Sequence, residues 1–527
     1  MTSKLAHSKK AMVTSPHVLA SQAGLEILRS GGNAIEAALT VASCLAVTYP
    51  HFTGFGGDSF LILSNAQGQV QTISGIGQAA QNTGEYVGAI PTRGARSMLT
   101  TAATVDAFGK AFEISRTQFG GKLTWDTLLS SAITLAREGF PVSQSQRFWL
   151  EFRKQEIANL PGVSRLFMPN GVIPEIGARI VQPQLATTIE MLAKNGHRDF
   201  YEGELARRIA QGLSIAGSPL KAGDLAKTAA RVEPPLTIGY RGGTLVSLQP
   251  PTQGVATLEI MGILNKFDFS KIMEGSADYY HVLVEAVKQA FIDRDSVADP
   301  EFTSFDPAAL LTDAHLSRGA QMISMKQALA WPHKFQTGVT VFVAAADEYG
   351  NAVSLLSTIY FDWGSGVAVG DTGLLWHNRG ASFSLNPVHP NRLEPGKRPF
   401  HTLNPGMYVK AGKAHILYGT QGADGQPQTL ATILTRLIDY EMDPWTALSK
   451  PRFLLGKTFS NSEDSLKLEV NVGADVVAEL TRRGHHIATI AAQSPLAGHS
   501  GTIVIDPDTG FKIGAHDPRS DGRALGL

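Results

Sequence analysis

The spacing of apolar residues changes along the chain, and the changes predict where helices and strands lie. Residues 17–49 have helical spacing: one segment ends at the glycine pair 31–32, and a second, apolar on all sides, starts after Asn33 and stops before Pro50. A glycine pair is a frequent helix C-cap, and a helix that is apolar all round is buried. Residues 58–75 alternate around an Asn-Ala-Gln-Gly turn, which predicts a hairpin.

Helices dominate the middle of the chain, and strands return towards its end. Helical spacing is clearest over 100–120 and 278–297, and 239–264 predicts a strand, a Pro-Pro break and a helix. After residue 340 strands alternate with helices. This order predicts an α+β or layered α/β protein whose sheets combine distant segments. The stretch 385–405, rich in proline and glycine, is the longest irregular one, and such loops are often functional.

A predicted hairpin in the middle of the chain carries candidate chemistry. In FQTGVTVFVAAADEYGNAVSLLSTIYFDWGSG, residues 335–366, Thr340 opens an apolar strand and Thr358 lies on the return strand. Threonine is common in strands, so Thr340 alone indicates little. If the peptide bond before it were cut, its free α-amine, with a pKa of about 7.7–8.0, could act as a base towards its own hydroxyl. One residue would then supply both nucleophile and base.

Composition and charge narrow the classes of function. Hydrophobic residues make up 43% of the 527 residues and charged ones 17%, which is typical of a globular protein with a large core. Lys+Arg and Asp+Glu both total 46, so charge gives no reason to expect nucleic acid or an anionic membrane as a partner. With no leader sequence or membrane-spanning run, we expect a cytoplasmic protein.

Other motifs are weaker than they first look. The lone cysteine, Cys44, lies in an apolar run and is expected to be a core residue. The cluster GFGGDSF, residues 54–60, lacks the ending of a phosphate-binding loop and predicts a tight turn into a strand. His485 and His486 follow a glycine and are expected to be exposed and idle. Without a paired His or Cys motif, we expect no metal and no cofactor.

Motifs along nearly the whole chain resemble the γ-glutamyltranspeptidase family, N-terminal-nucleophile hydrolases that cleave themselves before a threonine. The hairpin that starts at Thr340 resembles the beginning of the small subunit in that family. The further matching segments, in chain order, are SPHVLASQAGLEILRSGGNAIEAAL, YPHFTGFGGDSFLIL, PPTQGVATLEIMGIL, EAVKQAFIDRDSVADPEF, PGKRPFHTLNP, GTQGADGQPQ and DPRSDGRALG.

The resemblance implies a fold and a maturation step. The fold would be an αββα sandwich with two stacked antiparallel sheets between helices. Cleavage between Val339 and Thr340 would give a large fragment, 1–339, and a small fragment, 340–527, which remain one intertwined domain. A homodimer of cleaved protomers is compatible with this pattern.

The resemblance also implies catalytic roles. Thr340 would be the nucleophile, and Thr358 would hydrogen-bond to it. The backbone N–H groups of Gly422 and Ala423 would stabilise the oxyanion, provided that Ala423 is not forced to positive φ. In the family a glycine pair occupies these two positions.

The substrate pocket departs from the family pattern. The family arginine that pairs with an α-carboxylate is missing from SGIGQAAQ, residues 74–81, where Ile76 or Gln78 stands in its place. Three further family positions, an aspartate, a Ser-Ser pair and an asparagine, are occupied here by Ser382, by His401 with Thr402, and by Tyr360. One charge is gained: Arg379 replaces a neutral residue on the substrate side, where it could bind a carboxylate or form a structural ion pair.

These changes indicate an amide substrate that bears one carboxylate and no amino group. Oxamate, which a member of the family hydrolyses to oxalate and ammonia in purine (urate) breakdown, fits best, with Arg379, His401 and Thr402 holding its carboxylate. Two alternatives use the same Thr340: a γ-glutamyl (glutathione) hydrolase or transpeptidase, and a glutaryl-type acylase. A third alternative is a non-catalytic member that stays uncleaved and binds a small acid.

Overall fold

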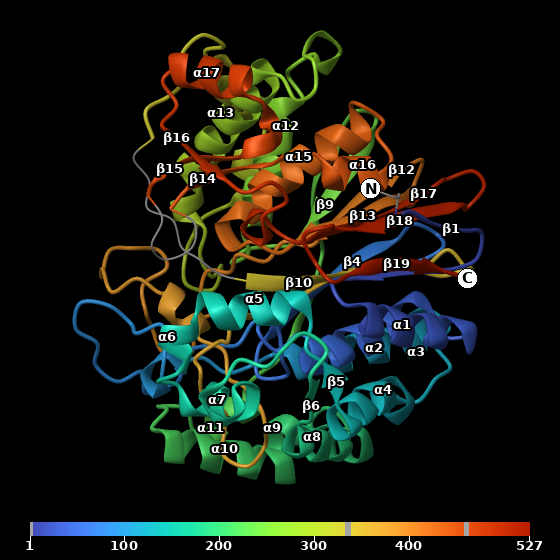
Figure 1. Ribbon diagram of the computed structural model, residues 1–527, viewed down its shortest axis with the longest axis vertical. Coiled ribbons are helices and arrows are strands. Elements are labelled where there is room, and N and C mark those ends of the chain that lie inside the picture. The colour runs from blue at the N-terminus through green and yellow to red at the C-terminus, as the bar shows by residue number, and fades with distance from the viewer. Residues whose placement is uncertain (1–3, 332–338, 458–462) are drawn as a thin grey trace.

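Two seven-stranded antiparallel sheets are stacked between two layers of helices in the computed structural model, which describes residues 4–331, 339–457 and 463–527 (Figure 1). The first sheet has the order β1 (Ala6–Ser8), β18 (Lys512–His516), β17 (Ser500–Ile505), β13 (Lys413–Thr420), β12 (Gly406–Lys410), β9 (Gly243–Ser247) and β8 (Leu236–Tyr240). The second has the order β19 (Arg523–Gly526), β2 (Met12–Ser15), β10 (Val339–Ala346), β11 (Ala352–Tyr360), β3 (Asp58–Ser64), β4 (Val70–Gly75) and β7 (Arg231–Glu233).

The outer helical layers come from different parts of the chain. Helices of the first half cover the second sheet, in the lower part of Figure 1. They are α1 (Val18–Arg29), α2 (Ala34–Thr48), α3 (Thr104–Gln118), α4 (Trp125–Glu138), α5 (Gln144–Phe152), α6 (Lys154–Ile157), α7 (Pro161–Phe167), α8 (Pro183–Asn195), α9 (Asp199–Glu202), α10 (Glu204–Ala216) and α11 (Ala222–Ala226).

Later helices cover the first sheet, in the upper part of Figure 1. They are α12 (Gly254–Leu264), α13 (Ala277–Asp293), α14 (Asp313–Gln321), α15 (Gln426–Ile438), α16 (Pro444–Ser449) and α17 (Ala474–Arg482). Two small sheets lie outside the sandwich: β14 (Phe453–Gly456), β15 (Ser465–Glu469) and β16 (Ile487–Ile490) form one, and β5 (Phe140–Pro141) with β6 (Arg179–Ile180) forms the other.

Strand β10 shows why the mid-chain run is apolar without interruption. Its side chains alternate between two buried environments, as strand geometry requires. Val341, Val343 and Ala345 pack into the helical layer, whereas Phe342 and Ala344 pack between the two sheets. Both faces of the strand are therefore in the core, which places its first residues deep inside the protein.

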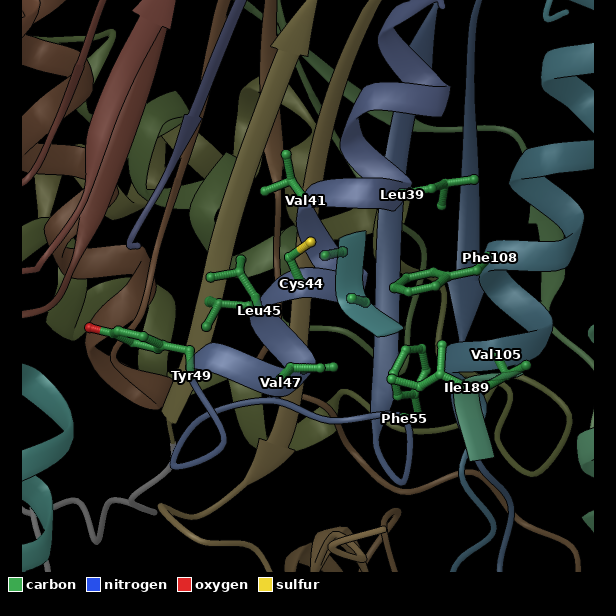
Figure 2. Packing of buried hydrophobic residues seen from close by; sticks show 14 of the residues in the cluster. Leu39, Val41, Cys44, Leu45, Val47, Tyr49, Phe55, Val105, Phe108 and Ile189 are labelled. Carbon is green, nitrogen blue, oxygen red and sulfur yellow. The ribbon is translucent and has the colours of Figure 1, made fainter. Parts of the chain in front are cut away.

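Helix α2 is buried on all sides, as its composition predicts. Figure 2 shows its side chains against those of neighbouring elements, with Cys44 among Leu45, Val41 and other apolar groups. Burial raises the pKa of the Cys44 thiol to about 12, so this cysteine is an inert core residue at neutral pH.

The predicted αββα sandwich is confirmed, and the two predicted fragments contribute to both large sheets. Strand β9 of the predicted large fragment pairs with β12 of the predicted small fragment, and β10 lies between β2 and β11. Two fragments sharing both sheets could not separate without breaking the core. The described part of the chain contains no helix with the length and apolar composition needed to cross a membrane.

Candidate active site

Thr340 is the second residue of β10 and is almost completely buried, with 1% of its surface exposed. Val339 and Thr340 are consecutive residues of the strand, so the structure describes the uncut chain. The Thr340 hydroxyl accepts a hydrogen bond from Gln426 Nε2 at 3.2 Å. Gln426 is the first residue of α15, directly after the turn that contains Gly422 and Ala423. The candidate nucleophile and the candidate oxyanion turn are therefore brought together.

Thr358 contacts the carbonyl group before Thr340. Its hydroxyl donates to the Val339 carbonyl oxygen at 2.5 Å and accepts the N–H of Tyr360 at 2.8 Å. The sequence predicted that Thr358 hydrogen-bonds to the nucleophile, Thr340. In the uncut chain the Thr358 hydroxyl instead donates to the Val339 carbonyl, the group that Thr340 would attack. A donor on that oxygen polarises the carbonyl and stabilises the charge that develops during attack.

The turn after β13 is strained at a non-glycine residue. Gly422 has φ 136° and Ala423 has φ 47°, so the condition attached to the predicted oxyanion hole, that Ala423 avoid positive φ, is not met. Gln253 fixes this turn by donating through Nε2 to the Ala423 carbonyl at 2.8 Å and to the Thr402 carbonyl. Tyr360 is also at positive φ, 74°. Such strain in bulky residues gathers at functional sites.

Arg379 is fully buried in a short 3-10 helix, Arg379–Ser382. Within the described residues, no hydrogen bond reaches any of its three guanidinium nitrogens. The guanidinium lies 3.6 Å from the centroid of the Tyr360 ring, a cation–π contact. Burial lowers the pKa of Arg379 to about 10, and Tyr360, Asp58 and Asp424 act in the opposite direction. The side chain is therefore charged at neutral pH with its donors unused.

His401 faces a buried carboxylate. Its Nε2 lies 3.2 Å from Asp58 Oδ2, and its Nδ1 accepts the Leu403 N–H at 3.4 Å. His377 Nδ1 lies 3.5 Å from the same Asp58 oxygen. Burial lowers the pKa of His401 to about 3, and Arg379 acts in the same direction. His401 is thus neutral, and both of its ring nitrogens have protein partners.

Two further predicted site residues, Ser382 and Thr402, make hydrogen bonds within the protein. The Ser382 hydroxyl donates to the Phe400 carbonyl at 3.1 Å. Thr402 is buried, and its carbonyl accepts from Gln253. A cavity of about 210 Å³ is lined by Ser382, Phe400 and Asp424 among others, which places open space beside the residue that follows Ala423.

The segment that lacks the family arginine is used for packing. Ile76 is buried, and Gln78 bonds through its side-chain amide to the Asp224 carbonyl at 3.0 Å and to the Thr101 hydroxyl. Between them, the Gly77 N–H donates to Asp58 Oδ1 at 3.0 Å. Neither Ile76 nor Gln78 offers a positive charge to a carboxylate. Residues 74–81 therefore supply no second cation that could bind a substrate carboxylate beside Arg379.

Sequence reasoning missed three residues of the site: Gln426, Gln253 and Asp58. Gln426 stands in GTQGADGQPQ, directly after the candidate oxyanion turn, and its place at a helix start could have indicated it. Asp58 is an acidic residue at the start of an apolar strand, which is an unusual position. The preceding glycines were predicted to form a turn, and a Cβ on Gly57 would lie 2.0 Å from the Thr358 carbonyl oxygen. That glycine allows β3 to begin against the candidate site.

The prediction that His485 is exposed and idle is wrong. His485 is 5% exposed, and its Nε2 lies 2.8 Å from His281 Nδ1, with Glu285 completing a cluster of metal-ligand type. Lys288 Nζ lies 2.7 Å from Glu285 Oε1. The Lys288 ammonium group therefore balances the Glu285 carboxylate, which a metal ion would otherwise do. His281 Nε2 faces the Ser324 carbonyl at 2.7 Å, and the cluster anchors that segment on α13.

Two stacked antiparallel sheets between helical layers, with a buried threonine at the start of a central strand, define an N-terminal-nucleophile hydrolase fold. A family model described as Gamma-glutamyltranspeptidase matches residues 20–527. The chain belongs to this family and is a self-processing amidohydrolase.

Similar proteins span nearly the same length. The chain is 41% identical to the oxamate amidohydrolase proenzyme of Klebsiella pneumoniae, covering 98% of this chain and 99% of that protein. It is 40% identical to the glutathione hydrolase-like YwrD proenzyme of Bacillus subtilis, covering 98% of each. The crystal structure of cephalosporin acylase from Bacillus halodurans superposes with a TM-score of 0.91 at 30% identity, covering 99% of this chain and 97% of that one.

Proposed function

We propose that the chain cuts itself between Val339 and Thr340 and then hydrolyses a small amide that bears one carboxylate, with oxamate as the substrate. The observation that carries this proposal is Arg379, a buried guanidinium whose donors have no partner among the described residues. Leaving such a charge unpaired is costly unless a ligand supplies the partner. A planar carboxylate fits the guanidinium fork with two parallel hydrogen bonds.

Maturation would start from the contacts in the uncut chain. The Thr340 hydroxyl oxygen attacks the Val339 carbonyl carbon, whose oxygen Thr358 already holds. The C–O bond forms, the hydroxyl proton passes to the Thr340 nitrogen, and the C–N bond breaks, so that this nitrogen becomes the free amine of Thr340. Water then hydrolyses the ester, which leaves the large fragment 1–339 and the small fragment 340–527.

Hydrolysis of oxamate would reuse the same hydroxyl. The Thr340 amine takes the hydroxyl proton, the oxygen attacks the amide carbon, and the proton passes to the departing ammonia. The N–H groups of Gly422 and Ala423 are kept as the proposed oxyanion donors although Ala423 has a left-handed φ, because Gln253 holds this turn in one direction. Arg379 holds the carboxylate over Tyr360. Water, deprotonated by the same amine, then hydrolyses the oxalyl ester to oxalate. The 41% identity to an oxamate amidohydrolase proenzyme supports this substrate. A place in purine breakdown is part of the same proposal.

Glutathione or another γ-glutamyl compound is the second candidate substrate. The 40% identity to a glutathione hydrolase-like proenzyme favours it, and the match to cephalosporin acylase keeps a glutaryl-type amide in view. Against the γ-glutamyl compound stands the lack of a charged partner for a substrate amino group at Ser382, which donates to a backbone carbonyl. A glutaryl amide carries no amino group, so the substrate assay has to separate it from oxamate. A non-catalytic acid-binding chain would keep the unpaired Arg379 but would stay uncut.

The test compares processing and substrate choice in one preparation. We expect purified protein to give two bands on a denaturing gel, with Thr340 as the first residue of the smaller one. A Thr340→Ala variant should stay a single chain of 56.3 kDa without amidase activity. Processed protein should release ammonia from oxamate and act poorly on γ-glutamyl-p-nitroanilide and glutaryl amides. The opposite preference, or a cut elsewhere, would refute the proposal.

A further inference from the structure

Arg379 lies near two carboxylates of its own chain and pairs with neither. His377, two residues before Arg379 in the chain, has its Nδ1 3.5 Å from Asp58 Oδ2, which places this carboxylate in the neighbourhood of Arg379. Both Asp58 and Asp424 also act to raise the pKa of Arg379. Asp424 is committed to Arg294, whose Nη1 lies 3.0 Å from its Oδ1. Asp58 is completely buried at the start of β3 and would be the natural partner of an unpaired guanidinium. What keeps the two apart therefore decides whether Arg379 is available to a ligand.

Every oxygen of Asp58 is occupied by other groups. Oδ1 accepts the N–H of Gly77 at 3.0 Å and that of Ala103 at 3.3 Å. Oδ2 faces His401 Nε2 at 3.2 Å. His377 Nδ1 lies 3.5 Å from the same oxygen without a hydrogen bond to it, and His377 Nε2 faces the Thr101 carbonyl at 2.9 Å. Burial would raise the pKa of Asp58, but His377 and His401 outweigh it and hold that pKa well below its usual range. The carboxylate is therefore ionised and fully used at neutral pH.

We propose that His401 occupies Asp58 and so prevents it from pairing with Arg379, which stays free for the carboxylate of a substrate. His401 is then a positioning residue that does not touch the substrate. This inference rests on the proposed function only for the identity of the carboxylate. It also changes the role that the sequence gave His401, which was direct contact with the substrate.

The hydrogen-bond pattern of His401 supports this role. The Leu403 N–H points at Nδ1, so Nδ1 is the acceptor and the ring proton sits on Nε2, facing Asp58. A neutral imidazole has a single N–H, and here the carboxylate already receives it. The ring also packs on Phe60, with centroids 4.5 Å apart, which fixes its orientation. No donor of His401 is left to bind a ligand.

The arrangement gives Arg379 a nearby negative charge without a contact. At a distance, the charge of Asp58 lowers the cost of burying the guanidinium and keeps it protonated. In contact, Asp58 would occupy the same fork that a substrate carboxylate needs, and binding would first have to break that pair. Stacking on Tyr360 holds the guanidinium plane from one side. The binding group is thus prepared before the ligand arrives, which reduces the cost of binding.

Four variants test the inference: His401→Phe, His401→Gln, Asp58→Asn, and the double variant His401→Phe/Asp58→Asn. Phenylalanine keeps the packing on Phe60 but frees Asp58 Oδ2, so KM for oxamate should rise at least about tenfold while kcat stays within about threefold. Glutamine retains an N–H donor and should keep a KM close to that of the parent protein. The double variant removes the competing charge and should restore KM, which a merely structural defect at residue 401 would not do.

Three results would overturn the inference. They are an unchanged KM in mature His401→Phe, a double variant no better than the single one, and a KM raised tenfold or more by Asp58→Asn alone. The last measurement decides the matter if His401→Phe does not mature, because the proposal requires that removing the Asp58 charge leave carboxylate binding equal or tighter.

A crystal structure of His401→Phe separates this inference from the proposed function. We expect an ion pair between Asp58 and Arg379 in that variant, whatever the substrate is. If the parent protein does not hydrolyse oxamate, the proposed function fails while the crystal structure still tests the role of His401. If oxamate is hydrolysed but Asp58 and Arg379 remain apart in the variant, the role of His401 fails alone.

Discussion

The chain buries arginines in two opposite ways. At the candidate active site Arg379 has no hydrogen-bond partner among the described residues, whereas Arg519, equally buried at the side chain, uses both ends of its fork. Arg519 donates to Glu469 through Nε at 2.8 Å and through Nη2 at 2.6 Å, and to Asp517 through Nη1 at 3.1 Å. The first arginine is kept available and the second is committed to the fold.

The surroundings of the two arginines explain the difference. Asp517 also accepts from Arg452 Nη2 and from the Ser500 N–H, and Glu469 accepts from the Ser494 N–H, so one network ties β15, β17 and the C-terminal segment together. Two described carboxylates, Asp58 and Asp424, act on the pKa of Arg379. Asp424 is bound to Arg294, and the Asp58 carboxylate is occupied by His401. The same residue type thus serves structure in one place and recognition in the other.

The largest expected effect is on stability at the committed site. Arg519→Met leaves Glu469 and Asp517 as buried charges with lost partners, which should cost about 3–5 kcal/mol of unfolding free energy. Arg379→Met, the matched control, replaces an unpaired charge by an apolar side chain and should lose no stability. Both are best measured by denaturant unfolding in a Thr340→Ala background, where we expect one uncut chain. Equal losses in the two variants would remove the contrast between the sites.

The second effect is on binding at the available site. Arg379→Met should weaken binding of oxalate, the expected product, by about 2–5 kcal/mol, which is roughly thirtyfold to several thousandfold in Kd. Arg379→Lys should recover part of the affinity, because an ammonium keeps the charge but not the two-pronged geometry. Calorimetric titration of processed protein with oxalate measures both. Unchanged affinity in Arg379→Met would mean that the guanidinium does not face the ligand.

Much of the fold could be predicted from the sequence because the relevant signals are local. The hairpin predicted over 58–75 is β3 and β4, and the capped segments over 17–49 are α1 and α2. The later segment 278–297 covers all of α13 except its first residue. In each case an apolar period and a nearby cap or turn residue give the same answer.

The state of the site residues could not be predicted, since it depends on contacts between distant segments. Arg379 could have been a structural ion pair, and only the placement of Asp58 and His401, more than three hundred positions apart, shows that it is not. His485 was expected to be exposed because it belongs to a histidine pair that follows a glycine, yet it lies buried against His281 on α13. The left-handed φ of Ala423 could not be predicted, because an alanine in the sequence gives no indication of positive φ.

The third effect is on the pH dependence of stability around the committed site. Burial lowers the pKa of His499 to about 4 and that of His516 to about 3, against about 6.5 in an unfolded chain. The unfolded chain therefore takes up protons below pH 6.5 that the folded chain refuses, so stability falls as the pH drops from 6.5 towards 4. His516→Gln should flatten this fall, with a slope that changes by up to one proton. Arg379 is not among the groups that act on the pKa of His499 or His516, so Arg379→Met should leave their contribution in place. Thermal unfolding between pH 7 and 4 measures the slopes.

Further acid should reach the ion pairs themselves. Burial would raise the pKa of Asp517, but Arg452 and Arg519 outweigh it and lower the value to about 2. Its stabilising contribution is then complete above about pH 4 and is lost as the pH falls towards 2. A stability that stays constant between pH 4 and 2 would contradict the assignment of this network as the charge-paired part of the core.

The smallest effect concerns the strained turn on the substrate side. Ala423 at φ 47° pays the cost of a left-handed residue with a Cβ, about 1–2 kcal/mol, whereas glycine adopts this conformation freely but loses more entropy on folding. Ala423→Gly should therefore change stability by no more than about 1 kcal/mol, towards greater stability. Because Gln253 still holds the carbonyl of residue 423, the turn should keep its direction, and self-cleavage should proceed at the parent rate. Time courses of fragment appearance measure this. A clear loss of cleavage would mean that the methyl group itself, rather than the backbone conformation, is what the site requires at this position.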